Sequence, residues 1–452
     1  MHRKETTIFV VAAALILLWQ LVLPPAVGVA DNGDFAKLIG RYSLGAPDRS
    51  AHLSTRYVFD IRYLWPSGFS SSELLLILSM LGVNRVLSKD GAVDLRLMGC
   101  IHGALFLAAL VLFLPVLDGT VRWRRVVFAS VALFMFCDVM YVSYLNSFYM
   151  DAAGYLGLLF TVVFYLRALK WGHLADRIFL VASSVFLVTS KPQHAALGVW
   201  FALLFALSRD VLWTGRRSVA AAVSALLLVT TWATFELEAP SSQTSVGCFN
   251  VVFHLVLPNS KHQAQTLAAL GLADSDRQWI GKTAYSAGMN FDDPSTVEYF
   301  ARKLSYPRLA WFFVTHPSDA VRSLRIALDE AGLERPSYLG NFDAASGQPA
   351  NSQSRAFALW SGLKRSLFEN HGRRLLLWFG GLAAIVITLL RLHHRTLPRG
   401  AFSGGIILIA MAVTEMLIAS LAEGMEPARH NLLFFAQFDM LLLTAAWLGL
   451  RS

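Results

Sequence analysis

The stretch TIFVVAAALILLWQLVLPPAVGVADNGDF, residues 7–35, decides how the rest of the chain is interpreted. Residues 7–29 form an apolar run long enough to cross the ~30 Å hydrocarbon core of a membrane as a helix. The run leads directly into Asp31, Asn32, Gly33 and Asp34, so two carboxylates lie at the edge of a hydrophobic segment. A loop that needs only solubility can use any polar residues. The acidic turn is therefore the first candidate for chemistry at a membrane–water boundary.

The same stretch has an alternative interpretation as a secretory signal. Arg3 and Lys4 precede the apolar run, and residues 28–30 before Asp31 resemble a signal-peptidase site. The apolar run is longer than the usual signal core of about 7–15 residues. Its length favours a retained first helix over a cleaved signal.

The composition predicts a membrane protein with many helices. Hydrophobic residues make up 55% of the 452 residues and charged residues 15%, whereas soluble domains carry about 25% charged residues. The net charge of +9 is spread over short loops, which suits orientation in a membrane and argues against a nucleic-acid-binding patch. The 3 cysteines, Cys100, Cys137 and Cys248, predict neither a disulfide framework nor a zinc site.

We expect an all-α integral membrane protein with about ten transmembrane helices. The predicted spans are residues 7–29, 97–117, 126–145, 153–169, 177–190, 194–208, 218–235, 375–391, 402–421 and 431–449. With the N-terminus inside, every short inside loop contains Lys or Arg, as the positive-inside rule requires. These loops are residues 1–5, 118–125, 170–177, 209–217 and 392–399. The pattern predicts cytoplasmic termini, as in a bacterial inner-membrane protein whose site faces the periplasm.

Two long outer segments divide the chain into parts. We expect an N-terminal transmembrane module, residues 1–235, that includes a first outer loop at residues 31–96. An extracytoplasmic domain at residues 236–374 and a C-terminal transmembrane module at residues 375–452 follow.

The outer segments carry their own helical signals. In the first loop, Ser71, Ser72 and Glu73 precede an apolar run too short to span, which predicts a helix lying at the interface. A second interfacial helix is expected near residues 34–44. The later segment should be mostly helical, with patterns at residues 263–272, 295–304 and 318–333.

Ionisable residues gather in the outer half of the predicted topology. They are Asp31, Asp34, Asp138, Asp151, Lys191, His194, Glu423, Glu426, Arg429 and His430, with Glu415 and Asp439 inside the last two spans. An ionised Asp at the bilayer centre costs about 2.5–3.5 kcal/mol. Asp138, Glu415 and Asp439 must therefore be neutral, paired, or facing a polar cavity. For each of them alone, a simple helix–helix hydrogen bond is an equally good explanation.

Residues 191–194, Lys-Pro-Gln-His, break the apolar pattern between two short predicted spans. Proline disfavours helical conformation at the residue before it. The break predicts either a re-entrant element that lines a cavity or an ordinary tight hairpin.

Acidic and basic turns that face one compartment suit sugar transfer from a lipid phosphate. A carboxylate is needed to accept the proton of the acceptor hydroxyl. Cationic side chains or a metal are needed to stabilise the departing phosphate. Glycine-rich phosphate loops, HExxH pairs and Gly-x-Ser-x-Gly motifs are absent from the sequence.

The chain resembles the GT-C superfamily of polytopic glycosyltransferases, which use polyprenyl-phosphate sugars on the outer side of the membrane. The resemblance is carried by the acidic turn at residues 31–35, by Asn-Ser-Phe-Tyr-Met-Asp at residues 146–151, and by Glu-Pro-Ala-Arg-His at residues 426–430. The turn has no adjacent pair of acids, and Asp151 stands where many members have Glu.

The resemblance implies a role for each candidate site residue. It implies Asp34 as the general base, or Asp31 if the register differs. It implies that Asp151, with Asp138, Asn146 and Tyr149, positions the acceptor or a metal. The resemblance implies that the donor phosphate is bound by Lys191, His194, Arg429 and His430, with Glu426 as a further candidate. Asp34 and Asp151 would be the ligands of a divalent metal, Mg²⁺ or Mn²⁺.

The sequence therefore predicts a membrane glycosyltransferase. Its partners would be a polyprenyl-phosphate-sugar donor, a glycan, lipid or protein acceptor, and membrane lipid, but no nucleic acid. One alternative is a polymerase or ligase of lipid-linked oligosaccharides, which would use a diphosphate donor. Another is a transporter or flippase, with which Asp138, Glu415, Asp439 and the break at Lys191 are compatible.

Overall fold

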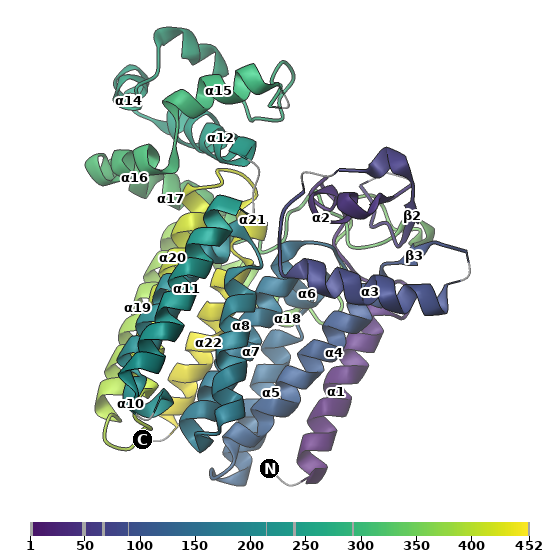
Figure 1. Ribbon diagram of the computed structural model, residues 1–452, viewed down its shortest axis with the longest axis vertical. Helices are drawn as coiled ribbons and strands as arrows, with labels where there is room; N and C mark the ends of the chain where they lie inside the picture. The colour runs from purple at the N-terminus through teal and green to yellow at the C-terminus, as the bar shows by residue number, and fades with distance from the viewer. Residues whose placement is uncertain are drawn as a thin grey trace.

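The computed structural model describes residues 3–47, 51–65, 68–88, 90–213, 215–237, 241–291 and 293–450, and it is mostly helical. Long helices run side by side in a bundle, with both chain termini at its lower end in Figure 1. The first outer loop and the segment after α11 (Arg217–Leu237) cover its upper end.

Seven of the described helices are long and apolar enough to cross a membrane. Besides α11 they are α1 (Arg3–Leu21), α4 (Arg96–Phe113) continued by η3 (Leu114–Leu117), α7 (Met150–Trp171), α19 (Gly372–Leu392), α20 (Ala401–Leu421) and α22 (Leu432–Gly449). An eighth span is obtained if α5 (Arg122–Phe136) and α6 (Val139–Leu145), which meet at a 60° bend, are taken together.

The prediction of ten spans is corrected to seven or eight, because the segments predicted at residues 177–190 and 194–208 form shorter helices. Helix α8 (Leu174–Val188) has 15 residues and reaches only about 22 Å at 1.5 Å per residue. The second segment consists of η4 (Pro192–Ala196) and α9 (Leu197–Leu207), followed by the short α10 (Arg209–Leu212). Helix α8 packs along α7 and α9 packs along α11. Pro192 and the polar break between the two segments limit their length.

The first outer loop contains the predicted interfacial helix and a sheet that was not predicted. Helix α3 (Glu73–Leu87) begins at the expected cap and lies across the upper end of α4 in Figure 1. The helix expected near residues 34–44 is reduced to α2 (Ala36–Ile39) and η1 (Gly40–Tyr42). The further elements are β1 (Leu44–Gly45), β2 (Arg56–Phe59), η2 (Ile61–Tyr63) and β3 (Val93–Asp94).

The small sheet corrects the all-α prediction. Its order is β1-β2-β3, and both pairs are antiparallel, with Leu44 opposite Phe59 and Tyr57 opposite Val93. Strands this short give no alternating pattern that could be recognised in the sequence.

The segment after α11 begins with a group of helices that has its own hydrophobic core. The helices are α12 (Ser241–Phe249), the π-helix η5 (Asn250–Val256), α13 (Leu257–Asn259), α14 (Gln263–Ala269), η6 (Asp274–Trp279), α15 (Pro294–Lys303) and α16 (Tyr306–Thr315). Phe249, Phe253 and Phe300 are central to this core. At the top of Figure 1 the group stands above the bundle.

The rest of that segment packs on the bundle itself. It contains α17 (Pro317–Ala331), η7 (Ala344–Ser346) and α18 (Leu359–Phe368). Leu328 and Phe368 belong to the main core, and α17 packs against α19 and α20. Helices α14, α15 and α17 confirm the three helical patterns predicted for this part of the chain.

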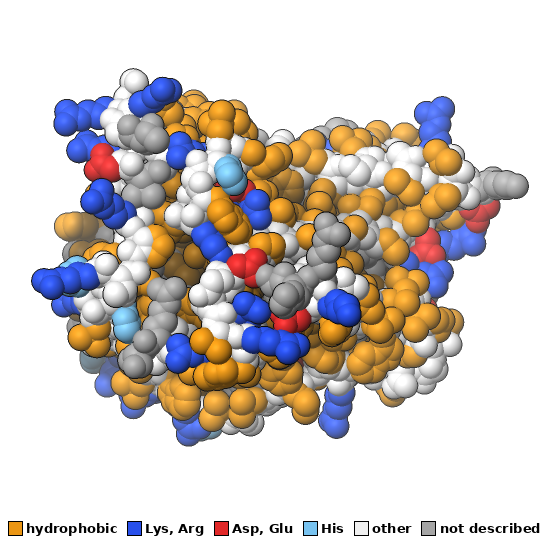
Figure 2. All heavy atoms as spheres, turned by 90° about the horizontal axis from the view of Figure 1, so that it is seen from below, with side chains coloured by type: hydrophobic (Ala, Val, Ile, Leu, Met, Phe, Trp, Pro, Cys, Tyr) orange, Lys and Arg blue, Asp and Glu red, His pale blue; other side chains and the backbone are white. Residues whose placement is uncertain are grey.

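Figure 2 shows the bundle from below, at the end that carries the termini. Many Lys and Arg side chains lie on this face. They agree with the basic inner loops that the sequence predicts.

Candidate functional site

The acidic turn after α1 uses its two carboxylates differently. Asp31 Oδ1 accepts hydrogen bonds from the backbone N–H of Gly33 at 2.8 Å and of Phe35 at 3.0 Å. Gly33 has a φ of 104°, which L side chains rarely adopt, so the turn requires glycine there. Asp31 therefore holds the backbone of the turn, whereas Asp34 points to other side chains.

Asp34 lies between two cations. Its carboxylate is 2.6 Å from Lys37 Nζ and 2.6 Å from Arg429 Nη2. Burial alone would raise the pKa of Asp34, but the positive charges of Arg429 and Lys37 outweigh burial and hold that pKa well below its ordinary value. Asp34 is therefore ionised over the whole neutral range.

Arg429 lies on α21 (Pro427–His430), the short helix between α20 and α22, and only 4% of it is exposed. Besides Asp34 it contacts Glu426 Oε2 at 2.5 Å, and its guanidinium lies 4.7 Å from the ring centroid of Tyr149. The Tyr149 hydroxyl donates to the carbonyl of Ala30 at 2.9 Å. Tyr149 thus joins the start of α7 to the acidic turn beneath the guanidinium.

His430 connects this ion pair to a second one. Burial lowers the pKa of His430 well below its ordinary value, and the charges of Lys191 and Arg429 lower it further. The neutral imidazole accepts a hydrogen bond at Nδ1 from Lys191 Nζ, at 2.8 Å. Lys191 Nζ also lies 3.1 Å from Asp151 Oδ1. We call the set Asp34, Lys37, Arg429, His430, Lys191 and Asp151 the ionic cluster.

His194 is held one step away from the ionic cluster. Its Nδ1 lies 2.9 Å from Glu415 Oε1, and Gln193 donates to Glu415 Oε2 at 2.8 Å. Gln193 also donates to the backbone carbonyl of His430 at 2.9 Å. Glu415 is therefore paired inside α20, as its position in a span demands.

The side chains of two predicted site residues form hydrogen bonds with backbone groups. Asp138 accepts from the N–H of Met140 at 2.9 Å and from the N–H of Ser361 at 3.0 Å, so it caps α6 and holds α18. Asn146 donates to the carbonyls of Leu21 at 2.7 Å and Val27 at 2.9 Å. Neither belongs to the ionic cluster, because backbone groups occupy both sides of the Asp138 carboxylate and the Asn146 amide nitrogen.

Lys37 was missed in the sequence, although its position three residues after Asp34 is the spacing of neighbours on a helix. A second buried group was also missed. Lys364 Nζ lies 3.1 Å from Asp439 Oδ2 and 3.2 Å from Glu334 Oε1. Nothing local in the sequence marks Glu334 and Lys364, since their pairing depends on how α17, α18 and α22 pack.

A family model described as "YfdI N-terminal transmembrane domain" matches residues 2–451. The chain belongs to the YfdI N-terminal transmembrane domain family. Neither a curated protein nor a solved structure matches it. The YfdI family match covers the acidic turn, α7, η4 and α21 together, so the whole ionic cluster lies within this transmembrane domain.

The residues of this YfdI-family chain do not fit the divalent metal that the GT-C resemblance implies. Asp34 already lies between Lys37 and Arg429, and Asp151 lies beside Lys191. These cations would repel a divalent ion at either carboxylate. Among the residues that the structure describes, no group of three or more His, Cys, Asp or Glu side chains could hold a metal. The positive charge of the site comes from Lys and Arg.

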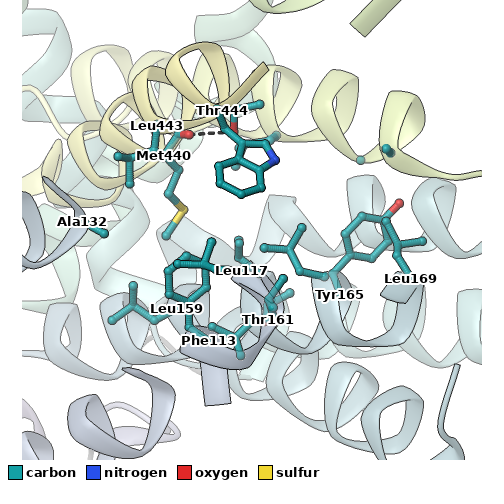
Figure 3. A pocket seen from close by; sticks show the side chains of 18 of the residues that line it. Phe113, Leu117, Ala132, Leu159, Thr161, Tyr165, Leu169, Met440, Leu443 and Thr444 are labelled. Carbon is teal, nitrogen blue, oxygen red and sulfur yellow. Dashed lines mark hydrogen bonds between the residues drawn. The ribbon is translucent and has the colours of Figure 1, made fainter. Parts of the chain in front are cut away.

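A separate apolar cavity of about 460 Å³ lies among α4, α5, α7, α20 and α22. Figure 3 shows Phe113, Leu117, Ala132, Leu159 and Met440 around it. Residues of the loops near Gly119 and Pro398 also line it. No member of the ionic cluster lines this cavity. Its lining is mostly apolar and suits hydrocarbon, with Asp118 and Lys170 as its charged members.

Proposed function

We propose that this YfdI-family chain is a membrane glycosyltransferase. It transfers a sugar from a polyprenyl-phosphate-linked donor to a glycan, lipid or protein acceptor on the outer face of the membrane. The observation that carries the proposal is the ionic cluster, in which an ionised carboxylate, Asp34, touches the two cations Lys37 and Arg429. This reaction needs a base that accepts a proton and, beside it, cationic groups that bind the phosphate.

The donor phosphate would bind to Arg429 and Lys37, since a guanidinium and an ammonium both form strong charge-assisted hydrogen bonds to phosphate. In the structure both cations are held by Asp34. A bound phosphate competes with Asp34 for them. The pKa of Asp34 then rises towards its ordinary value, because the charges that lowered it are shared with the phosphate. Donor binding thereby makes Asp34 a stronger base, which can accept the proton of the acceptor hydroxyl.

The reaction follows from this arrangement. The oxygen of the acceptor hydroxyl forms a bond to the anomeric carbon of the sugar, and the bond from that carbon to the phosphate oxygen breaks. Asp34 takes the hydroxyl proton. Arg429 and Lys37 stabilise the charge on the departing polyprenyl phosphate.

The location of the site supports transfer on the outer face. The ionic cluster lies towards the end of the bundle where α21 and the first outer loop meet, opposite the end that carries both termini. The end with the termini is rich in Lys and Arg (Figure 2), and such loops stay in the cytoplasm. We infer a bacterial inner membrane, with both termini cytoplasmic and the site facing the periplasm.

The test is transfer of labelled sugar from a panel of polyprenyl-monophosphate donors in right-side-out and inverted membrane vesicles. We compare wild type, Asp34→Asn and Asp90→Asn, the last being a matched control because Asp90 is an exposed partner of Arg56 in the same outer loop. With a membrane-impermeant acceptor, wild type and the control should be active in right-side-out vesicles only. Asp34→Asn should lose about a hundred-fold or more of the rate.

Full activity of Asp34→Asn would contradict the role of this carboxylate. Transfer only from diphosphate-linked oligosaccharides would favour a ligase or polymerase. Movement of the intact donor across the membrane, without transfer, would favour a flippase.

A further inference from the structure

The apolar cavity among α4, α5, α7, α20 and α22 has no part in the proposed reaction. Its volume of about 460 Å³ is roughly three times that of an engineered 150 Å³ cavity that binds benzene. Figure 3 shows Phe113, Ala132, Leu159 and Met440 among the apolar side chains around it. An empty space of this size deprives its lining of van der Waals contacts, so the cavity favours an occupant.

Water is a poor occupant of this cavity. A buried water makes about three hydrogen bonds to polar groups that lack other partners. In the lining, the Tyr165 hydroxyl already donates to the carbonyl of Gly400 at 2.8 Å. The Thr444 hydroxyl likewise donates to the carbonyl of Met440 at 2.8 Å. The Thr161 hydroxyl has no hydrogen-bond partner among the described residues, but one hydroxyl cannot hold a chain of waters. The lining therefore suits a hydrocarbon chain.

The charged members of the lining do not offer a site for a charged ligand. Lys170 Nζ donates to the carbonyls of Pro115 at 3.0 Å, Val116 at 2.9 Å and Asp118 at 2.7 Å. An ammonium group has three donors, so these carbonyls use all of them. Asp118, the other charged residue of the lining, would repel a phosphate. A phosphate head group must therefore lie outside the cavity, which receives an apolar chain alone.

The cavity belongs to the half of the bundle that carries the termini. On α7 its lining runs from Leu158 to Lys170, about 18 Å at 1.5 Å per residue, which is slightly more than one leaflet of a ~30 Å hydrocarbon core. Gly119 and Leu397 of the predicted inner loops also line it. Asp151 of the ionic cluster lies about 10 Å further along α7. The chain of a donor whose phosphate binds at the ionic cluster would start from the opposite side of the membrane.

We propose that the cavity binds one acyl chain of an anionic phospholipid from the leaflet on the side of the termini. Arg395 and Arg399 flank Leu397 and Pro398 of the lining, and both are exposed. Many Lys and Arg side chains lie on this face in Figure 2, and basic segments at the membrane surface attract anionic lipid head groups. The acyl chain fills the space between five helices while the head group stays among the basic loops.

The first experiment labels the wild-type protein and needs no variant. Purified full-length protein in detergent is irradiated with phosphatidylglycerol that carries a diazirine near the end of one acyl chain, and labelled peptides are identified by mass spectrometry. We expect label on the lining of α7 between Leu158 and Lys170. Label confined to exposed positions of other spans, such as Ile8 and Trp232, would overturn the proposal.

The second experiment measures binding of phosphatidylglycerol to variants that fill the cavity. Ala132→Phe on α5 and Ala109→Phe on α4 each place a ring in it. The matched controls are Val131→Phe and Ala108→Phe, at neighbouring positions of the same helices that are exposed and outside the lining. Thermal unfolding verifies that each variant is folded, and two separate filling variants keep the test valid if one of them misfolds.

We expect the filling variants to bind phosphatidylglycerol at least about ten-fold more weakly than wild type, since losing the burial of about two methylene groups suffices for that. The controls should bind it as wild type does. Wild-type binding by folded filling variants would overturn the cavity as the site. Equally tight binding of phosphatidylcholine would overturn the choice of an anionic head group. Displacement of the labelled lipid by polyprenyl phosphate would overturn the choice of a phospholipid, since the donor's own chain would then be the occupant.

Discussion

Asp31 and Asp34 belong to one short turn, yet backbone N–H groups hold the first carboxylate and two cationic side chains hold the second. The difference matters for the proposed sugar transfer. A carboxylate that caps a turn cannot move towards a substrate without unfolding the turn. A carboxylate that is paired with cations can exchange them for a bound phosphate. The contacts of the single residues therefore favour Asp34 over Asp31 as the base of the proposed reaction.

The two cations of Asp34 lead to a prediction about pH. In the free protein they hold the pKa of Asp34 well below its ordinary value, so the carboxylate keeps its charge until the pH falls far below about 4. In the proposed donor complex the cations would be shared with the phosphate. The acid limb of kcat, which reports the complex, should therefore lie at higher pH than the acid limb of kcat/KM, which reports the free enzyme.

Steady-state rates measured from about pH 3 to pH 8 should show the acid limb of kcat, while kcat/KM should stay level over this range because its limb lies at lower pH. Lys37→Gln removes one of the cations, so it should move the kcat/KM limb upward towards the kcat limb. If the two limbs coincide in wild type, donor binding does not change the basicity of Asp34.

At the scale of the helices, a few close contacts fix how neighbouring helices are positioned in this bundle. The α5–α6 pair bends by 60° where Asp138 caps the second helix, so one predicted span became two helices. Next to this pair, Asn146 ties the end of α1 by donating to the carbonyls of Leu21 and Val27. Gly99 of α4 makes room for the Asn146 side chain, since an added Cβ would overlap its oxygen.

We predict that Gly99→Ala destabilises the protein, whereas Gly103→Ala, one turn further along the same helix, does not. An added Cβ at Gly103 would have its nearest neighbour at 3.6 Å, an ordinary contact. Overpacking at Gly99 should cost about 1–3 kcal/mol. Alanine at Gly103 should be neutral or gain up to about 1 kcal/mol from its better helix propensity.

Thermal unfolding in one detergent compares the two glycine variants with wild type. Equal unfolding temperatures for both variants would show that Asn146 can move away from an alanine methyl group without loss.

At the scale of the whole molecule, the buried group around Lys364 joins the outer segment to the last span. Lys364 lies on α18, Glu334 follows α17, and Asp439 is inside α22, where Tyr141 and Trp360 also donate to it at 2.6 Å and 2.8 Å. Two carboxyl groups share one ammonium here. Breaking such a buried pair by removing one partner is costly, because it leaves an uncompensated charge.

This group should make stability depend on pH. Burial raises the pKa of Glu334 from 4.5 to about 8, even with Lys364 beside it. The folded protein therefore keeps a proton that the unfolded chain releases, and its stability should fall as the pH rises from about 4.5 through about 8. Glu334→Gln cannot release that proton, so it should lose less stability over the same range.

Unfolding temperatures measured at intervals from pH 5 to pH 9 give the slope for each protein. Glu369→Gln, at a partly exposed ion pair with Arg365, is the control and should keep the wild-type slope. A Glu334→Gln slope equal to that of wild type would mean that Glu334 is already ionised at pH 5.

The order of residues along the chain is enough to predict a membrane protein, the positions of most of its long helices, and the positions of α3, α14, α15 and α17. These features follow from apolar length, helix caps and loop charge, which are properties of neighbouring residues. It also brought Asp34, Asp151, Lys191 and Arg429 together as candidates, because all of them fall on one side of the predicted topology.

The pairing of these residues became visible in the folded protein. The tertiary structure assigned Asp31 to the turn and Asp34 to Arg429, gave Asp138 to the backbone, and joined Glu334 to Lys364. It also replaced ten spans by seven or eight. The physical reason is that hydropathy and capping act between neighbours along the chain. Ion pairs and close helix contacts instead depend on which distant segments pack together.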